Sequence, residues 1–527
     1  MNNDKFARAD ERAGIISAGN GGLPAFGFNR LLAGITIFLV LGAFLRLTRL
    51  NADLWLDEGY TWVETSTNTF GALFHNLANA HTGSERLAPL YYFLVYFWRD
   101  LFGDSEASLH LLSILMSVAS LVLLVDAARR LFGEGAALWA AAVGGSSAFL
   151  VAYGGFIRPY ALVILFTCVV VDAWAADCTS VRSRKGPIGW CAVGAAGLMA
   201  GIALSFIPLT MMALCDWRLR SDWRRWVLLW GPSAALSIPV CLGLYGGWIL
   251  WGGTLSVPDR QGMLISLLFA IYGVAVGETY GPTVQALHAT HQIDVVLGYL
   301  PRLILLAGVL ISLAVNAIRV LTRLGGGTSN AIPMLALRSL VLMLLGSMLL
   351  GAAVGYFGHL NWLPRHAFFA APLLVLIVAA LPTLDISVLV GATPVVVLIM
   401  MNAISIVNME FRYEYALDDY AGVARFLNSA DVRGSVPVMV YGVVPLLRDY
   451  YHVSGLIDGL EVGPDELGTS LTRLSGGASD VTVVINRQWS WARGRLDAAQ
   501  ADCYEVREHR QFAYFDLYRM TREAKCP

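Results

Sequence analysis

Long apolar segments alternate with short polar stretches over most of this chain. The first covers residues 31–50, which as a helix are long enough to cross the hydrocarbon core of a bilayer. Others lie at residues 109–125, 136–153, 159–176, 226–245, 296–320, 333–356, 367–381 and 386–407, and residues 187–217 have room for two short helices. This pattern predicts about eleven membrane-spanning helices.

Basic residues between the apolar segments indicate which side of the membrane each loop occupies. They form four clusters, at residues 129–130, 182–185, 218–225 and 319–323. Because cytoplasmic loops are enriched in Lys and Arg, we place all four clusters in the cytoplasm. If the N-terminus and all four clusters are cytoplasmic, the chain must cross the membrane an even number of times between any two of them. A crossing by the apolar stretch 89–102 or 263–277 would break this rule. We expect the first to be a helix on the outer surface and the second to dip into the membrane from outside.

The resulting organisation has three parts. Residues 1–30 are polar, lack the compact apolar core and cleavage site of a signal peptide, and form a cytoplasmic segment. Residues 31–409 form a transmembrane domain with long outer loops at 51–107 and 246–295. Residues 410–527 lie outside the cytoplasm, and in them charged residues become frequent and apolar runs short.

The last part has the pattern of a small α/β domain. It shows helical spacing at residues 418–428 and strand patterns at 438–441, 481–485, 504–508 and 512–518. The last two strands are close enough to pair as a hairpin. An oxidising compartment favours a disulfide between Cys503 and Cys526, whereas the penultimate position of Cys526 favours a frayed chain end. We therefore predict a polytopic all-α membrane protein with a C-terminal extracytoplasmic α/β domain.

Composition agrees with this architecture and excludes some functions. Hydrophobic residues make up 57% of the 527 residues and charged residues only 14%, which is typical of a membrane protein. The formal net charge of −1 argues against a nucleic-acid partner, because such partners usually need a basic face. No group of Cys and His residues has the spacing of a zinc site, so no metal ligands are predicted.

Two adjacent carboxylates, Asp57 and Glu58, directly follow the first apolar segment. Carboxylates close to lipid are costly unless they are hydrated, paired or used in function. Trp55, Tyr60 and Trp62 surround them, as expected at a membrane–water interface. The pair is either part of an active site or a hydrated loop in which Asp57 caps a helix.

Arginines in the outer loops are candidates for binding a phosphate. Arg158 stands where one span turns back into the membrane, and Arg365 lies in a short outer loop. A guanidinium group binds phosphate through parallel hydrogen bonds, but an interfacial Arg also binds lipid headgroups without specificity. Arg86 and Arg302 are weaker candidates of the same type.

Several short motifs occur in an order that resembles the GT-C membrane glycosyltransferases. This family includes the protein O-mannosyltransferases, the lipid A aminoarabinose transferases and the rhizobial core-sugar transferases. The motifs are Leu56-Asp57-Glu58, Pro89-Leu90-Tyr91-Tyr92, Phe102-Gly103-Asp104-Ser105-Glu106, Arg130-Leu131-Phe132-Gly133 and Arg158-Pro159-Tyr160-Ala161-Leu162. Two positions depart from the family pattern. Leu87-Ala88-Pro89 replaces His-Pro-Pro, and Phe156 replaces an acidic residue, so a carboxylate-held metal lacks one expected ligand.

The resemblance implies an inverting glycosyltransferase of the bacterial inner membrane. Its donor is a sugar on polyprenyl phosphate, and its acceptor is a hydroxyl of lipid A or core glycan, of another glycolipid or of a protein. The resemblance makes Asp57 the catalytic base, assisted by Glu58. The donor phosphate needs cations and hydrogen-bond donors at the outer interface, and the candidates are Arg158, Arg365, Tyr160 and Arg86. The resemblance fixes no cofactor, and a divalent cation stays an open alternative.

Two other function classes compete with this interpretation. A transporter or flippase for a lipid-linked sugar would also use interfacial Arg and buried carboxylates, but it needs no folded outer domain and usually shows repeats. A non-catalytic scaffold would use Asp57 only as a helix cap. Transfer from a defined lipid donor in vitro separates all three classes.

Overall fold

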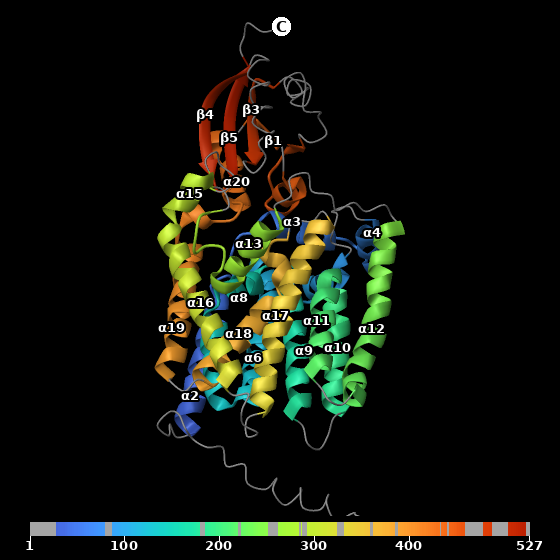
Figure 1. The fold of residues 1–527 in the computed structure, drawn as a ribbon. Coiled ribbons are helices and arrows are strands. Elements are labelled where there is room, and N and C mark those ends of the chain that lie inside the picture. Colours follow the sequence, from blue (N-terminus) through green and yellow to red (C-terminus); the bar gives the residue numbers. More distant parts are fainter. Residues whose placement is uncertain are drawn as a thin grey trace, which may run out of the picture.

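The computed structural model places a small sheet domain at one end of a bundle of long helices (Figure 1). It describes residues 28–79, 87–179, 185–219, 223–250, 262–283, 286, 292–323, 331–358, 362–384, 388–432, 434–439, 442–458, 478–486 and 504–522. Arg86, Cys503 and Cys526 lie outside the described residues, and so does the N-terminal segment before residue 28.

Seven helices of the described chain are long and apolar enough to cross a membrane, which makes this a multi-pass membrane protein. They are α2 (Phe28–Leu47), α6 (Glu106–Phe132), α9 (Tyr160–Thr179), α12 (Trp223–Leu250), α16 (Leu300–Arg323), α17 (Ala331–Phe357) and α19 (Val388–Phe411).

Four more predicted spans correspond to shorter or broken helices. Helices α7 (Glu134–Ser146) and α8 (Ala148–Gly155) follow each other with a bend of 58°, and together they give an eighth candidate span. Helices α10 (Lys185–Gly201), α11 (Phe206–Leu219) and α18 (Ala370–Leu384) lie where the sequence predicts three further crossings. The total of about eleven spans therefore stays a prediction.

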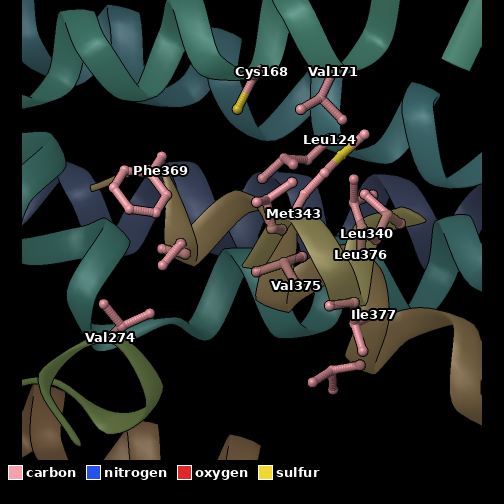
Figure 2. Close-up of a cluster of buried hydrophobic side chains, with 14 of the residues drawn as sticks. Leu124, Cys168, Val171, Val274, Leu340, Met343, Phe369, Val375, Leu376 and Ile377 are labelled. Atoms are coloured by element: carbon pink, nitrogen blue, oxygen red, sulfur yellow. The ribbon is translucent and has the colours of Figure 1, made fainter. Parts of the chain in front are cut away.

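Helix α18 lies in the centre of the bundle. Nearly all of its side chains are buried, whereas Leu242 on α12 and Leu389 on α19 are 67% and 78% exposed, as expected for a lipid-facing surface. Figure 2 shows Val375, Leu376 and Ile377 of α18 among side chains of α6, α9 and α17. In a bilayer this core is held by close packing more than by exclusion of water, because lipid tails are as apolar as the side chains.

Short helices lie at the sheet-domain end of the bundle. They are α3 (Leu56–Thr65), α4 (Phe70–Asn79), α5 (Pro89–Phe102), α13 (Met263–Val276) and α15 (Gln292–Gly298). The predicted helix at 89–102 is thus present, and the apolar stretch 263–277 forms α13. Helix α5 begins with Pro, which fits the first turn because no N–H is needed there, and ends before Gly103 at a φ of 82°.

The C-terminal domain has a mixed sheet in the order β2-β1-β3-β5-β4. The strands are β1 (Val436–Met439), β2 (Ile457–Asp458), β3 (Asp480–Asn486), β4 (Tyr504–Phe512) and β5 (Phe515–Arg522). Strand β1 pairs in parallel with β2 and β3, and β4 and β5 form the predicted antiparallel hairpin. Helix α20 (Tyr420–Leu427) is also as predicted, and the Asp419 side chain caps it by accepting a hydrogen bond from Gly422 N.

The C-terminal domain contacts the segment that carries the two carboxylates. Leu54 N donates a hydrogen bond to Tyr451 Oη at 3.0 Å, and Tyr451 Oη donates to Glu106 Oε1 at 3.1 Å. Leu446 packs directly onto Gly59, where an added Cβ would lie 2.6 Å from Leu446 Cδ2. The domain therefore rests on α3.

Candidate active site

A cavity of about 1080 Å³ lies between the helical bundle and the C-terminal domain. Residues 52–57, helix α8, the end of α13, the loop before α18 and the end of α19 contribute to its wall. The C-terminal domain contributes Asp418, Asp419, Arg425 and Tyr514. The cavity thus gathers polar side chains from segments far apart in the chain.

Asp57 lies on the first turn of α3 and lines the cavity. A carboxylate is favourable at this position, because the free N–H groups of a helix start give it a partial positive charge. Arg365 Nη1 lies 3.2 Å from Asp57 Oδ2, and the two side chains are 37% and 19% exposed. The structure therefore brings the predicted base and one predicted phosphate ligand into contact, within reach of the cavity.

Arg365 is held by a tightly packed loop. It belongs to the short 3-10 helix Pro364–Ala367, in which Leu363 N donates a hydrogen bond to His366 Nδ1 at 3.0 Å. Pro364 packs against Gly273 of α13, where an added Cβ would lie 2.6 Å from Pro364 Cβ. A side chain at position 273 would push this loop, and Arg365 with it, away from α13.

Glu58 lies behind Asp57 and does not line the cavity. It is 1% exposed, and its carboxylate accepts hydrogen bonds from Ile157 N at 2.9 Å and from Trp55 N at 3.4 Å. Burial raises the pKa of Glu58 above its ordinary value, although His110 and the N–H of Ile157 oppose this shift. In this position Glu58 fastens the start of α3 to the segment before α9.

Arg158 also contacts α3 and is not part of the cavity lining. Its Nη1 donates hydrogen bonds to Asp57 O at 3.1 Å, Tyr92 Oη at 3.2 Å and Thr61 Oγ1 at 3.4 Å. Arg158 thus ties α3, α5 and the start of α9 together, and its contact with a phosphate stays a prediction. The next residue but one, Tyr160, does line the cavity.

Arg302, the other weaker candidate, faces a different group of residues. It donates a hydrogen bond to Tyr280 O at 3.1 Å and lies over the ring of Tyr299 at 5.3 Å from the ring centroid. It is not among the residues that line the cavity.

Glu278 lines the cavity, and the sequence analysis missed it. It follows Gly277, whose φ of 78° turns the chain at the end of α13, and its Oε1 accepts a hydrogen bond from Tyr153 Oη at 2.5 Å. Burial raises the pKa of Glu278 above its ordinary value, against the effects of Tyr153 and Arg365. The available signal was a lone carboxylate directly after the apolar stretch 263–277, in an expected outer loop.

Asp418 of the C-terminal domain is a further carboxylate in the cavity wall. It is 3% exposed and accepts a hydrogen bond from Asn486 Nδ2 at 3.1 Å. Burial raises the pKa of Asp418 to about 7, although the Asn486 amide opposes the shift. Near neutral pH this group therefore titrates within the site.

The described residues contain no group of three or more His, Cys, Asp and Glu side chains placed to hold a metal ion. Asp57 is paired with Arg365, and Glu278 with Tyr153. Both carboxylates are therefore already paired within the protein. The side chains present can accept a proton from a hydroxyl at Asp57 and stabilise an anion at Arg365.

Comparison with known proteins identifies the fold. Residues 86–251 match the family model described as dolichyl-phosphate-mannose-protein mannosyltransferase, and no curated protein matches the chain. The crystal structure of ArnT from Cupriavidus metallidurans bound to undecaprenyl phosphate is similar, with a TM-score of 0.53 and 14% identity over 93% of this chain and 98% of that one.

The oligosaccharyltransferase of Archaeoglobus fulgidus in its apo form is also similar. Its TM-score is 0.51, with 11% identity over 91% of this chain and 72% of that one. Identities this low show the fold alone, and the predicted fold class is thereby confirmed. The chain thus has the fold of these two membrane proteins, and residues 86–251 are similar to the mannosyltransferase family.

Proposed function

We propose that the protein is an inverting glycosyltransferase that moves a sugar from polyprenyl phosphate to a hydroxyl outside the cytoplasm. The observation that carries this proposal is the pairing of Asp57 with Arg365 at 3.2 Å in the wall of a cavity of about 1080 Å³. A base and a cation side by side are what this reaction needs, because one group accepts a proton while the other stabilises a phosphate.

The reaction forms one bond and breaks one bond at the same carbon. The acceptor oxygen attacks the anomeric carbon from the side opposite the phosphate, and the bond from that carbon to the phosphate oxygen breaks. The hydroxyl proton passes to Asp57, and the leaving polyprenyl phosphate takes the electron pair next to Arg365. Attack from the opposite side inverts the anomeric centre.

Binding of the donor changes the charge balance of the pair. In the free protein Asp57 neutralises Arg365 at 3.2 Å. A phosphate that binds Arg365 competes with Asp57 for the guanidinium group, which frees a carboxylate oxygen to accept the proton. The donor would thus help to prepare the base for its own reaction.

The lipid part of the donor needs an apolar surface beside the phosphate. Ile265 and Phe269 of α13 and Val296 of α15 line the cavity, and Ile265 is 61% exposed and Val296 38% exposed. An isoprenoid chain that lies against these side chains would stay in contact with the bilayer. The undecaprenyl phosphate bound to the similar ArnT structure supports a donor of this class.

The C-terminal domain forms part of the cavity wall, so residues of this domain are in a position to contact an acceptor. The acceptor is a hydroxyl of lipid A or core glycan, of another glycolipid or of a protein. We place the enzyme in the bacterial inner membrane, with the N-terminus in the cytoplasm and the C-terminal domain in the periplasm. The basic clusters of the sequence support this orientation.

Transfer by the purified protein tests the proposal. Proteoliposomes receive a polyprenyl-phosphate sugar with each acceptor class in turn, and a nucleotide sugar serves as the control donor. We expect a product only with the lipid donor, with inverted anomeric configuration. Movement of the lipid donor between leaflets without transfer to any acceptor would identify a flippase instead.

A further inference from the structure

The bend between α7 and α8 separates polar backbone groups that a continuous helix would pair. In an unbroken helix, Ala148 N would donate to Gly144 O and Phe149 N to Gly145 O. Instead, Ala148 N donates to Asn402 Oδ1 of α19 at 2.8 Å. The two carbonyls accept hydrogen bonds from Arg46 of α2, Gly144 O at 3.2 Å and Gly145 O at 3.3 Å.

Arg46 is suited to this position because every nitrogen of its guanidinium group has an acceptor. The side chain is 1% exposed, and besides the two carbonyls it donates to Ser117 Oγ at 2.7 Å and to Gly42 O at 2.8 Å. A buried charge without such partners would be costly. Its positive charge also lies at the end of α7 where the helix dipole is negative.

Two glycines let α2 approach the bend closely enough for this contact. A Cβ on Gly42 would lie 2.8 Å from Gly145 Cα, and a Cβ on Gly145 would lie 3.1 Å from Phe38 O. The backbones of α2 and α7 are therefore in contact at this point, as small residues allow in membrane helices.

Asn402 joins the start of α8 to the end of α13. Its Oδ1 accepts from Ala148 N, and its Nδ2 donates to Ala275 O at 2.9 Å. Two further residues on the same face of α19 hold the loop that follows. Ser405 O accepts from Thr279 Oγ1 at 2.7 Å, and Asn408 Nδ2 donates to Thr279 O at 2.8 Å.

Helix α8 and the loop after α13 carry two side chains that meet in the cavity. Tyr153 of α8 donates to Glu278 at 2.5 Å, and both residues line the cavity. Gly277 lies so close to Ala148 that an added Cβ would be 2.8 Å from Ala148 Cβ. The direction of α8 and the place of Glu278 are therefore set at one junction.

We propose that Arg46 and Asn402 are positioning residues, which hold the bend open so that Tyr153 and Glu278 face the reacting groups. Neither residue lines the cavity, so each acts through the backbone groups that it binds. The expected effect of these residues on turnover rests on the proposed function. Their expected effect on the position of α8 rests on the structure alone.

The test compares Asn402→Leu with a matched variant, Asn316→Leu. Asn316 is also a buried amide that donates to a carbonyl of another helix, Val390 O at 3.1 Å, but it is not part of the junction. We expect a similar loss of thermal stability in both. Only Asn402→Leu should lower kcat, by about tenfold or more, with the affinity for undecaprenyl phosphate within about twofold of wild type.

A second readout needs no turnover. Hydrogen–deuterium exchange of the amides in residues 148–155 and 277–283 should rise in Asn402→Leu and in Arg46→Met, and stay unchanged in Asn316→Leu. Arg46→Lys should restore part of the protection, because it keeps the charge and loses donors. Unchanged exchange in both segments for Asn402→Leu would overturn the proposal. If wild-type protein transfers no sugar, the proposed function fails, and the exchange data still decide this inference.

Discussion

Asp57 Oδ2 and Arg365 Nη1 lie 3.2 Å apart although 308 positions separate the two residues in the chain. The contact exists because α3 rests under the C-terminal domain and the loop before α18 packs on α13. Two residues from distant segments thus form one ion pair in the wall of the cavity.

Replacement of Arg365 should weaken binding of the donor phosphate. We expect Arg365→Ala to lower the affinity for undecaprenyl phosphate about 10- to 100-fold, because a hydrogen bond to a charged group contributes about 1.5–3 kcal/mol. Arg365→Lys should restore part of it, since Lys keeps the charge but lacks the planar pair of donors. Titration of the purified protein with undecaprenyl phosphate measures this.

Arg302→Ala is the matched control for that experiment. Arg302 is an arginine of the same part of the molecule that binds Tyr280 O and does not line the cavity. We expect the affinity of Arg302→Ala for undecaprenyl phosphate to stay at the wild-type level. Equal losses in both variants would show that the effect is nonspecific, and no loss in Arg365→Ala would move the phosphate site elsewhere.

Glu58 should contribute to stability more than to chemistry. In Glu58→Gln, the amide group of Gln would point a donor at Ile157 N or Trp55 N, both of which are donors to the carboxylate. A buried donor left without an acceptor costs about 1–3 kcal/mol of unfolding free energy. Thermal unfolding in detergent should show a lower midpoint. A variant as stable as wild type that has lost all turnover would instead make Glu58 a chemical group.

Asp418 should make stability depend on pH near neutrality. Its pKa is about 7 in the folded protein and near 3.8 when unfolded, so the folded state holds the extra proton between these values. Stability therefore falls as pH rises from about 4 to about 7. The side chain of Asp418→Asn cannot ionise, so the variant lacks this loss of stability. Its unfolding midpoint should therefore rise relative to that of wild type as the pH rises from about 4 to about 7. A constant difference from pH 4.5 to pH 8 would contradict this.

The orientation in the membrane can be tested by labelling. Single Cys residues at the exposed positions Phe70 and Arg425 should react with an impermeant reagent added to intact cells, and a Cys at position 184 should not. Labelling at 184 and protection at 425 would invert the arrangement that the basic clusters predict.

The sequence predicted the parts of the fold that depend on local pattern. The hairpin of β4 and β5, helix α20 and the helix at 89–102 all follow from periodicity and turn residues. The bend between α7 and α8 was not predicted, because its partners, Arg46 and Asn402, come from distant helices.

The sequence likewise predicted only those site residues that a local position marks. Asp57 stands out by its place after the first span, and Arg365 by its outer loop. Glu278 has no motif, and its role depends on Tyr153, which is 125 positions away. The burial of Glu58 and the contacts of Arg158 with α3 likewise depend on tertiary packing, which no spacing in the sequence expresses.

The most direct test of the account is sugar transfer by Asp57→Asn. Asp57 lies inside the first turn of α3, after the N-cap Trp55, so the helix does not depend on it as a cap. Asn keeps the size of the side chain and an acceptor oxygen, but it cannot take the acceptor proton. With a polyprenyl-phosphate sugar as donor, the account predicts that turnover falls by roughly two to four orders of magnitude while the protein expresses and folds normally. Transfer at the wild-type rate by a normally folded Asp57→Asn protein would contradict the assignment of Asp57 as the base.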